Sequence, residues 1–345
     1  MSDLSVGVVL SLIAGILNGS FASPTKYVKQ WKWENIWPVW AAVGMILAPM
    51  VVLFATIPNP LGFYRDAALR DLLLLFGFGV GFGLAQICFG LGLAAVGLAL
   101  GFALMIGLTT VVGSMVPLII QQPETALTPK GLMIIAGVAV ILVGIIFCAV
   151  AGGKKERESR TAAGNQGEST AGGRSFKMGL VICFFGGALG PFINFGLAFG
   201  TPLLKRAAEL GVSPANRPNV LWPPLMMAAF VPYLAYCIYL WRKNRTLHLF
   251  TLPGTGINWL FGAIMGSLWL GSTVIYGAAT SRMAGMGPIL GWPLFMSIII
   301  ITSNVWGFMT GEWKGVSRKP LTLMLVGISF LILGFCTLAV GARLR

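Results

Sequence analysis

KGLMIIAGVAVILVGIIFC at residues 130–148 and KPLTLMLVGISFLILGFC at residues 319–336 are the stretches of sequence that decide the fold. After its first, basic residue, each stretch contains no charged side chain. An apolar run of about 20 residues is long enough to cross the hydrocarbon core of a bilayer as a helix. Each run also carries two glycines seven residues apart, Gly137 and Gly144 in the first and Gly327 and Gly334 in the second. The two stretches therefore predict membrane helices at equivalent places in two halves of the chain.

The composition of the whole chain agrees with a membrane protein. Hydrophobic residues make up 57% of its 345 residues and charged residues 10%, whereas soluble domains contain about 25% charged residues. The sequence predicts an all-α integral membrane protein with ten transmembrane helices. The expected spans lie near 4–23, 36–57, 71–95, 97–121, 131–150, 178–202, 219–241, 257–279, 285–310 and 320–342.

The ten spans divide into two sets of five. Residues 1–150 form the first predicted five-helix repeat, 151–177 a polar linker and 178–345 the second repeat. Because each set has an odd number of spans, the second repeat enters the membrane inverted, as in many secondary transporters. An offset of 187 residues also places Gly79 on Gly266 and Gln86 on Thr273. Glycine is abundant here, so chance alignment is the competing explanation.

The distribution of basic residues predicts the orientation. Connections after odd-numbered spans hold fifteen Lys and Arg residues, against nine on the other side. The positive-inside rule places the linker in the cytoplasm and both termini outside. The linker is polar and rich in Gly and Ser, so we expect a disordered tether. The net charge of +14 is explained by residues that flank spans, and we expect no binding of nucleic acid.

Glycines and single polar residues share one helical face in the third and eighth spans. In the third span Gly79, Gly83, Gln86 and Gly90 follow at steps of four, three and four, and Thr273 lies in the matching stripe of the eighth. One explanation is a close contact between helices. The other is that Gln86 and Thr273 meet as repeat-related partners at a central cavity and contact a polar ligand.

The polar groups predicted at membrane depth are neutral donors and acceptors, apart from the edges of the spans. Such amides, hydroxyls and phenols suit a neutral sugar better than an ion, and tryptophan rings suit the C–H faces of a sugar. Packing is the competing role of each aromatic ring. The candidate substrate-binding residues are Gln86, Thr273, Asn194, Tyr276, Trp269, Trp292, Asn18 and Asn304.

No aspartate or glutamate lies squarely inside an apolar run, which leaves few candidates for proton coupling. Glu34 and Glu312 lie at span edges beside Lys32 and Lys314, where surface ion pairs are the favoured role. Arg282 lies in the short connection after the eighth span, a possible cavity mouth. These three residues are the weaker, coupling candidates.

Other chemistry is not indicated. The five cysteines have no close spacing, and no cluster of His, Asp, Glu or Cys has the spacing of a metal site or a nucleophilic centre. We therefore expect no enzyme activity, no metal and no cofactor. Prolines at 49, 117, 191, 232 and 293 predict kinked or broken helices. Pro191, three residues before Asn194, is the break most suggestive of a substrate site.

Three segments resemble a known family. FASPTKYVKQWKWENIW at 21–37, GLGLAAVGLALGFALMIGLTTVVGSMVPLI at 90–119 and GEWKGVSRKP at 311–320 resemble the bacterial L-rhamnose–proton symporter family of the drug/metabolite transporter superfamily. The likeness runs through all ten spans and is weakest in the linker. It implies ten helices in two inverted repeats, uptake of a deoxy-sugar with protons and a place in the bacterial inner membrane. No binding residue can be transferred by motif.

The leading hypothesis is a symporter that imports a neutral monosaccharide with protons by alternating access, with L-rhamnose as the expected sugar. Its cavity would be lined mainly by spans one, three, four, six, eight and nine. A metabolite or drug exporter of the same superfamily fits the fold equally. A non-transporting membrane sensor is the second alternative, and the absence of a soluble output domain argues against it.

Overall fold

The structure is a computed structural model of the chain, and it describes residues 3–162, 174–283 and 285–344. These residues form helices and no strand. Ten helical segments are long and apolar enough to cross a membrane, which confirms the predicted spans. Their bounds are Asp3–Tyr27, Trp33–Thr56, Leu69–Val96, Leu98–Gln121, Pro129–Ser159, Phe176–Glu209, Trp222–Asn244, Gly256–Thr280, Gly287–Met309 and Arg318–Gly341.

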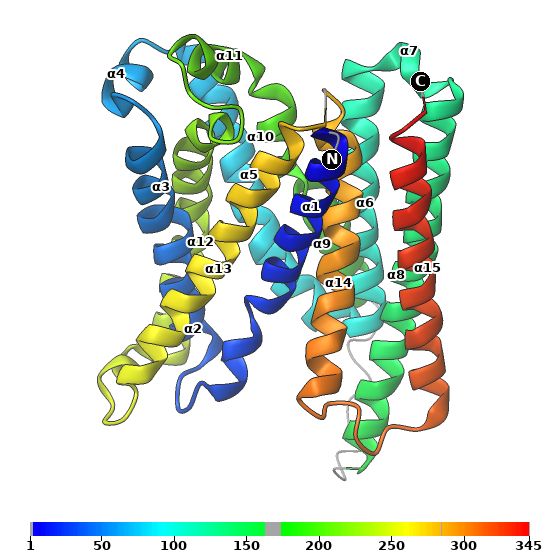
Figure 1. Cartoon of the computed structure of the whole chain (residues 1–345). Coiled ribbons are helices and arrows are strands. Elements are labelled where there is room, and N and C mark those ends of the chain that lie inside the picture. Colours follow the sequence, from blue (N-terminus) through cyan, green and yellow to red (C-terminus); the bar gives the residue numbers. More distant parts are fainter. Residues whose placement is uncertain (1–2, 163–173, 284, 345) are drawn as a thin grey trace. The chain divides into compact units, whose positions relative to one another are not determined.

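The chain folds into two compact units, and each unit takes segments from both predicted halves (Figure 1). Unit 1 comprises Met1–Leu84 and Phe192–Gly287, and unit 2 comprises Ala85–Pro191 and Pro288–Arg345. The helix α5 (Leu69–Val96) begins in unit 1 and ends in unit 2. The units are thus not the predicted repeats, which describe an arrangement along the sequence and stay a prediction.

In unit 1, the helix α13 packs against α1, α2 and the π-helical segment η2, and α12 also packs against η2. The elements of unit 1 besides α5 are α1 (Asp3–Ser20), η1 (Ser23–Tyr27), α2 (Trp33–Ala41), η2 (Ala42–Leu47), α3 (Ala48–Thr56), α4 (Pro60–Arg65), α10 (Phe192–Phe199), α11 (Thr201–Glu209), η3 (Arg217–Val220), α12 (Trp222–Asn244), η4 (Leu247–Thr251) and α13 (Gly256–Thr280).

In unit 2, α8 packs against α15 and α6, and α6 also packs against α9 and α14. The elements of this unit are α6 (Leu98–Gln121), α7 (Pro123–Ala126), α8 (Pro129–Ala162), α9 (Arg174–Leu189), α14 (Trp292–Met309) and α15 (Arg318–Gly341), and the π-helical segment η5 (Gly287–Gly291) begins at the boundary between the units.

The predicted break at Pro191 is confirmed. The helix α9 ends at Leu189 and α10 begins at Phe192. A proline has no N–H to donate to the carbonyl four residues earlier, which here is the carbonyl of Gly187. Thr109 Oγ1 of α6 donates to that carbonyl at 3.0 Å. A side chain of a neighbouring helix thus replaces the hydrogen bond that the proline removes.

The same replacement occurs at Pro293 in α14. This proline cannot donate to the Ile289 carbonyl, and Ser114 Oγ of α6 donates to it at 2.6 Å. Ser114 is completely buried, so the bond is made away from water. The two hydroxyls of α6, from Thr109 and Ser114, therefore stabilise the interrupted backbones of its neighbours.

The helices α8 and α15 pack against each other through glycines. A Cβ added at Gly144 would lie 2.9 Å from the Gly327 carbonyl oxygen, and one added at Gly334 would lie 2.9 Å from that of Gly137. Small residues permit this close approach of two backbones. Gly144 faces Gly327 while Gly137 faces Gly334, so the two helices run in opposite directions.

Glycines also mark close helix contacts in unit 1. A Cβ at Gly79 or Gly83 of α5 would collide with backbone carbonyls of α12, and one at Gly266 of α13 would lie 2.7 Å from the Trp40 carbonyl oxygen of α2. These three glycines therefore serve close packing, the first of the two explanations offered for the stripes. The ligand role predicted for Gln86 and Thr273 stays a prediction.

The predicted disordered tether is wrong at both of its ends. Residues 151–162 continue α8 as a helix, residues 174–177 form the start of α9, and the predicted linker residues 163–173 lie outside the described part of the chain. Lys, Glu and Arg are good helix formers, and contacts hold the extension in place. Lys155 pairs with Glu312 at 2.6 Å, and the Glu158 carboxylate accepts hydrogen bonds from the backbone N–H and the hydroxyl of Ser317, the N-cap of α15.

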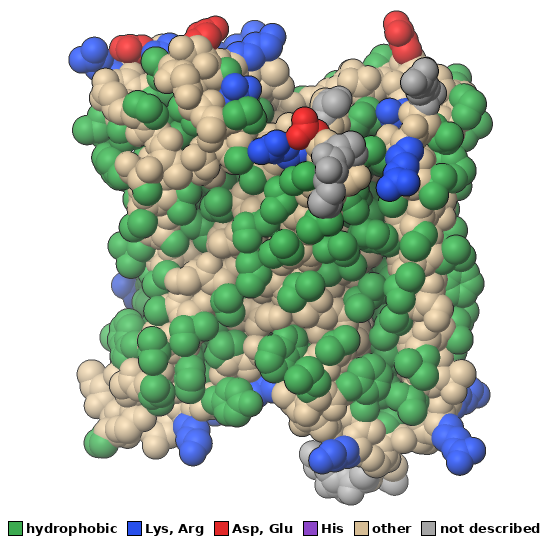
Figure 2. Space-filling model, viewed as in Figure 1, with side chains coloured by type: hydrophobic (Ala, Val, Ile, Leu, Met, Phe, Trp, Pro, Cys, Tyr) green, Lys and Arg blue, Asp and Glu red, His purple; other side chains and the backbone are tan. Residues whose placement is uncertain are grey.

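The surface of each unit is suited to contact with the lipids of a bilayer. On the face shown in Figure 2, hydrophobic side chains cover the middle of each unit, and charged side chains gather mainly near the helix ends. Large apolar side chains such as Val51, Phe54 and Phe76 are more than half or about half exposed. Exposed apolar surface of this extent is expected where lipid surrounds the protein.

Candidate functional site

Unit 1 brings together two predicted substrate-binding residues, Asn194 and Tyr276. Asn194 lies on the short helix α10 that follows the Pro191 break, and Tyr276 lies on α13. The Tyr276 hydroxyl donates to Asn194 Oδ1 at 2.7 Å, and both side chains are buried. A phenol and an amide together offer donors and acceptors without charge, the chemistry predicted for a neutral sugar.

A second polar pair joins α1 to α13. Asn18 Nδ2 donates to Ser272 Oγ at 2.8 Å, and Ser272 donates in turn to the Trp269 carbonyl at 2.6 Å. The neighbouring Thr273 is buried and donates to the same carbonyl at 3.0 Å. Asn18, Ser272 and Thr273 therefore belong to one hydrogen-bonded group around a single turn of α13.

An aromatic cluster surrounds the predicted platform Trp269. Its ring lies 5.0 Å from the ring of Trp40 and stacks on Phe82 with 6.2 Å between centroids. Trp40 also contacts the rings of Trp37 and Tyr233. Trp40 was not among the predicted site residues. The sequence does contain a pattern that could have predicted this cluster. Residues 33, 37 and 40 are all tryptophan, and their spacing of four and three residues places them on one face of a helix.

The predicted site residues of unit 2 have other surroundings. Trp292 is buried, and its Nε1 donates to the Thr109 carbonyl of α6 at 2.9 Å. Asn304 Nδ2 donates to the Ile300 carbonyl of its own helix at 2.9 Å. Gln86 is half-buried on the part of α5 that belongs to unit 2. Thr273 belongs to unit 1, so the predicted meeting of Gln86 and Thr273 stays a prediction.

The surface ion pair expected between Glu34 and Lys32 is wrong. Glu34 is 6% exposed, and its Oε1 accepts hydrogen bonds from Asn244 Nδ2 at 2.9 Å and from Thr246 Oγ1 at 3.0 Å. These neutral groups lie at and just after the end of α12. The sequence could not reveal this because the contacts join residues more than 200 positions apart.

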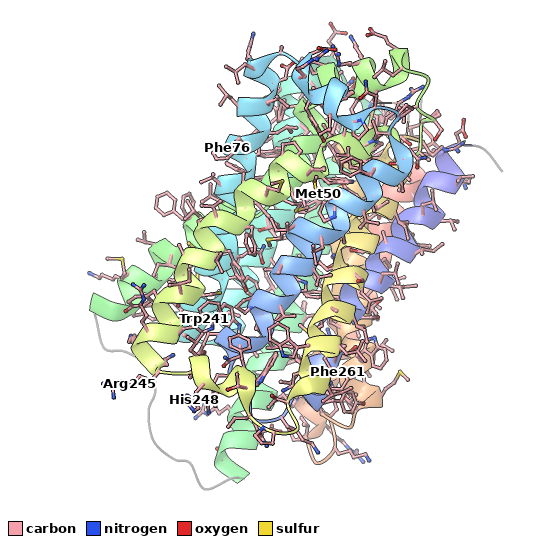
Figure 3. All side chains as sticks on the ribbon, turned by 90° about the vertical axis from the view of Figure 1, so that its left-hand side faces the viewer. Met50, Phe76, Trp241, Arg245, His248 and Phe261 are labelled. Atoms are coloured by element: carbon pink, nitrogen blue, oxygen red, sulfur yellow. The ribbon has the colours of Figure 1, made fainter. Side chains whose placement is uncertain are left out.

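The backbone of Glu34 is also held by α12. Pro38 cannot donate to the Glu34 carbonyl, and Trp241 Nε1 donates to it instead. Figure 3 shows Trp241, Arg245 and His248 together at this end of unit 1. This hydrogen bond gives Trp241 a structural role.

The other two coupling candidates form ion pairs. Glu312 pairs with Lys155 of α8 at 2.6 Å, and not with the adjacent Lys314 as expected. Helix α8 extends further than the sequence suggested, which brings Lys155 to Glu312. Arg282 pairs with Asp3 at the start of α1 at 2.9 Å. Both pairs are partly exposed, as ion pairs at span ends usually are.

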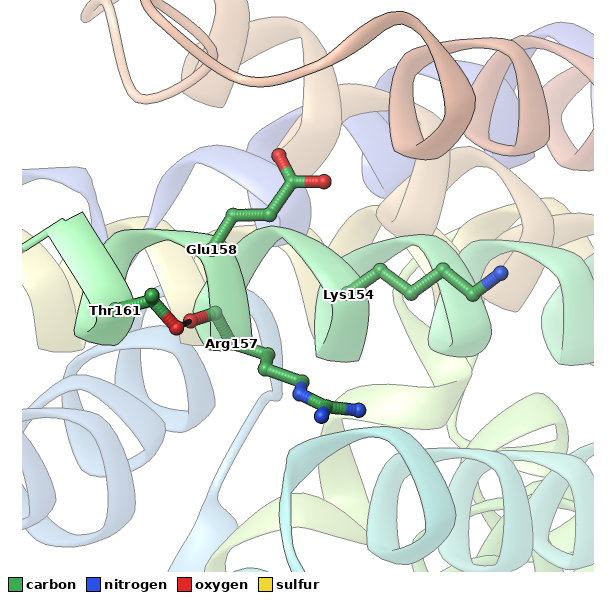
Figure 4. Close-up of a pocket in the computed structure, with 4 residues that line it drawn as sticks. All are labelled: Lys154, Arg157, Glu158 and Thr161. Atoms are coloured by element: carbon green, nitrogen blue, oxygen red, sulfur yellow. Dashed lines mark hydrogen bonds between the residues drawn. The ribbon is translucent and has the colours of Figure 1, made fainter. Parts of the chain in front are cut away.

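One surface pocket lies on the extension of α8 (Figure 4). It is open and is lined by Lys154, Arg157, Glu158 and Thr161. None of the predicted substrate-binding or coupling residues lines it. The described residues contain no group of three or more His, Cys, Asp and Glu side chains placed to hold a metal ion.

Comparison with known proteins places the chain among sugar transporters. Residues 1–343 match the family model of the L-rhamnose-proton symport protein. The chain is 28% identical to the L-rhamnose-proton symporter of Shigella dysenteriae over 345 residues, covering 98% of each chain. It is 26% identical to the L-rhamnose-proton symporter of Yersinia pestis over 343 residues and 97% of each chain, and 28% identical to that of Escherichia coli strain 55989 over 98% of each.

The family match covers all ten helices described above and agrees with the resemblance found in the sequence. The match identifies a multi-pass membrane transporter and not an enzyme. The chain belongs to the L-rhamnose-proton symport protein family.

Proposed function

We propose that this protein imports L-rhamnose together with protons by alternating access. The match of the family model to residues 1–343 carries this proposal, and relatives named L-rhamnose-proton symporters align over nearly their whole length. This favours proton-coupled import over the exporter and the sensor.

We further propose that the polar groups of unit 1 bind the sugar. The buried pair of Asn194 and Tyr276 supports this, because a phenol and an amide match the hydroxyls of a neutral sugar. The aromatic cluster around Trp269 offers flat apolar surface for C–H groups. Asn18, Thr273, Gln86, Trp292 and Asn304 remain further candidates.

The proposed setting is the bacterial inner membrane, with the linker in the cytoplasm and both termini in the periplasm. The ten candidate spans support placing both termini on one side, because an even number of crossings returns the chain to its starting side. The excess of Lys and Arg in the odd-numbered connections supports the direction. A reporter fused after Arg345 that is active only in the cytoplasm would contradict this orientation.

The inverted repeat is also part of the proposal. The antiparallel contact of α8 with α15 supports it, because Gly137 and Gly144 meet Gly334 and Gly327 in reciprocal order. Two elements related by a two-fold axis make contacts of this reciprocal kind.

Uptake in cells that lack their own L-rhamnose transport tests the function. Labelled L-rhamnose should enter only when the chain is expressed, and a proton uncoupler should abolish its accumulation. L-fucose and D-glucose, tested in parallel, report the choice of sugar. Absence of uptake of every sugar, with the protein present in the membrane, would contradict import. Accumulation that the uncoupler does not change would remove the proton from the proposal.

A further inference from the structure

Glu34 is the one buried carboxylate in the described part of the chain. The other described aspartates and glutamates are exposed or half-buried, and no described lysine, arginine or histidine is buried. Glu34 lies in the first turn of α2, at the edge of a membrane span. A buried carboxylate is costly in its charged form unless hydrogen bonds or a cation stabilise it. The role open to Glu34 therefore depends on the groups that surround its carboxyl group.

The partners of the Glu34 carboxylate are neutral. Asn244 and Thr246 donate to its Oε1, and none of the ion pairs found among the described residues includes it. The ionisable groups that face it are Tyr236 and Cys237 of α12, and Lys32 precedes it on its own segment. Without a bound cation, the carboxyl can gain or lose a proton without breaking an ion pair.

The strength of the contact between α2 and α12 depends on whether the Glu34 carboxyl is charged. Hydrogen bonds to an ionised carboxylate are about twice as strong as those to a neutral group. The charged form therefore ties the start of α2 to the end of α12 more firmly than the protonated form. Protonation loosens a contact between two helices whose other residues include Trp40 and Tyr233 of the aromatic cluster.

We propose that Glu34 carries the proton that is coupled to sugar transport, and that Asn244 and Thr246 hold its charged form after the proton has left. This inference rests on the proposed function. One carboxylate oxygen takes a proton from water on one side of the membrane and forms an O–H bond. That bond breaks when the proton passes to water on the other side, so no further reactant is needed.

Transport by the full chain in proteoliposomes tests the proposal. A gradient of one pH unit should drive about tenfold accumulation of L-rhamnose when one proton moves with each sugar. The Glu34→Gln variant keeps the size of the side chain but cannot carry a proton. We expect it to lose accumulation and proton uptake while exchange of labelled for unlabelled sugar, without a gradient, stays within about twofold of the unmodified protein.

Asp66→Asn is the matched control, because it removes an exposed carboxylate that pairs with Arg206 and is not among the coupling candidates. It should keep both accumulation and exchange. Accumulation by Glu34→Gln at the level of the unmodified protein would overturn the proposal. Loss of both accumulation and exchange by folded Glu34→Gln would also overturn it and assign Glu34 to the helix contact alone. Absence of transport by the unmodified protein would instead refute the proposed function, and this inference with it.

A second variant covers the case in which Glu34→Gln does not fold. Thr246→Val keeps the carboxyl but removes a donor that stabilises its charged form. Because the charged carboxylate then lacks one of its two donors, accumulation driven by the gradient should fall while exchange without a gradient stays within about twofold of the unmodified protein. Accumulation by folded Thr246→Val at the level of the unmodified protein would contradict the proposal.

Discussion

Two polar pairs at the middle of unit 1 differ from the buried polar side chains of unit 2 in the kind of hydrogen bond that they make. In unit 2, Thr109, Ser114 and Trp292 donate to backbone carbonyls, and two of these carbonyls lost their usual donor to a proline. At the middle of unit 1, Asn18 and Tyr276 bond to other side chains. A backbone carbonyl cannot leave its helix, whereas a side chain can rotate toward a new partner. These two pairs of unit 1 are therefore better suited to exchange partners with a ligand.

The largest expected effect concerns the close backbone contact of α8 with α15 in unit 2, which serves as a reference for both kinds of hydrogen bond. Gly144→Leu would push a side chain into the Gly327 carbonyl, which an added Cβ alone would approach to 2.9 Å. Overpacking of this kind costs about 3 kcal/mol, so folded protein in the membrane should fall sharply. Size-exclusion chromatography of extracted protein measures the loss.

Gly152→Leu on the same helix is the control. A Cβ there would have its nearest neighbour at 3.8 Å, and the variant should fold normally. Equal folded amounts of the two variants would show that the glycines of α8 do not serve packing.

The second prediction tests whether the α6 hydroxyls replace hydrogen bonds removed by prolines. Ser114→Ala should destabilise the protein by about 1–3 kcal/mol, because the Ile289 carbonyl is left buried without its donor. In a Pro293→Ala background the backbone N–H at position 293 can donate to that carbonyl, and the same serine substitution should cost much less. Thermal unfolding of the four proteins of this double-mutant cycle measures the difference.

An equal cost of Ser114→Ala in both backgrounds would mean that the serine acts independently of Pro293. The comparison between the units would then lose its physical basis, because Ser114 would no longer be tied to a broken helix. Transport per folded molecule should stay unchanged in Ser114→Ala, as expected of a structural hydroxyl.

The third prediction concerns the pair that unit 1 offers to a ligand. Tyr276→Phe removes the hydroxyl that bonds to Asn194. If this hydroxyl also serves the sugar, kcat/KM for L-rhamnose should fall about tenfold, which corresponds to about 1.4 kcal/mol. Initial uptake rates, divided by the amount of folded protein, measure this change.

Tyr64→Phe is the matched control for a lost tyrosine hydroxyl. Tyr64 lies on α4, between two spans, and donates to the Val220 carbonyl at 2.8 Å. Val220 lies just before the N-cap of α12, so its carbonyl has no donor within that helix. The control should lower stability and leave the uptake rate per folded molecule unchanged. Equal uptake by folded Tyr276→Phe and the unmodified protein would remove Tyr276 from the proposed site.

The sequence predicts the spans well and the contacts poorly, for a physical reason. Burial in lipid requires long uncharged runs, so hydropathy alone locates all ten helices, and proline chemistry locates the break at Pro191. The environment of Glu34 depends on residues of α12 that lie far along the chain. No local sequence pattern shows which distant residues contact Glu34. The same holds for Trp40, whose neighbours Tyr233 and Trp269 come from two other helices.

The helical extension of α8 could not be predicted from composition, for a different reason. Residues 151–162 are polar, which in a soluble context would suggest a flexible linker. Their Lys, Glu and Arg residues favour a helix, and Glu312 and Ser317 of a distant loop bind it. Composition therefore indicated where the apolar run ends but not where the helix ends.

The smallest expected effect concerns the contact between α1 and α13. Ser272→Ala removes the acceptor of Asn18 Nδ2, and Asn18→Leu removes the donor. Because Asn18 is only half-buried, it can rotate toward another partner, and the coupling energy of the two substitutions should be about 0.5–1 kcal/mol. Ser11→Ala, which removes a bond within α1 alone, should show no coupling with Asn18→Leu. A coupling energy as large as the cost of Ser114→Ala would mean that this pair is as fixed as the bonds of unit 2, and the distinction between the two units would fail at this position.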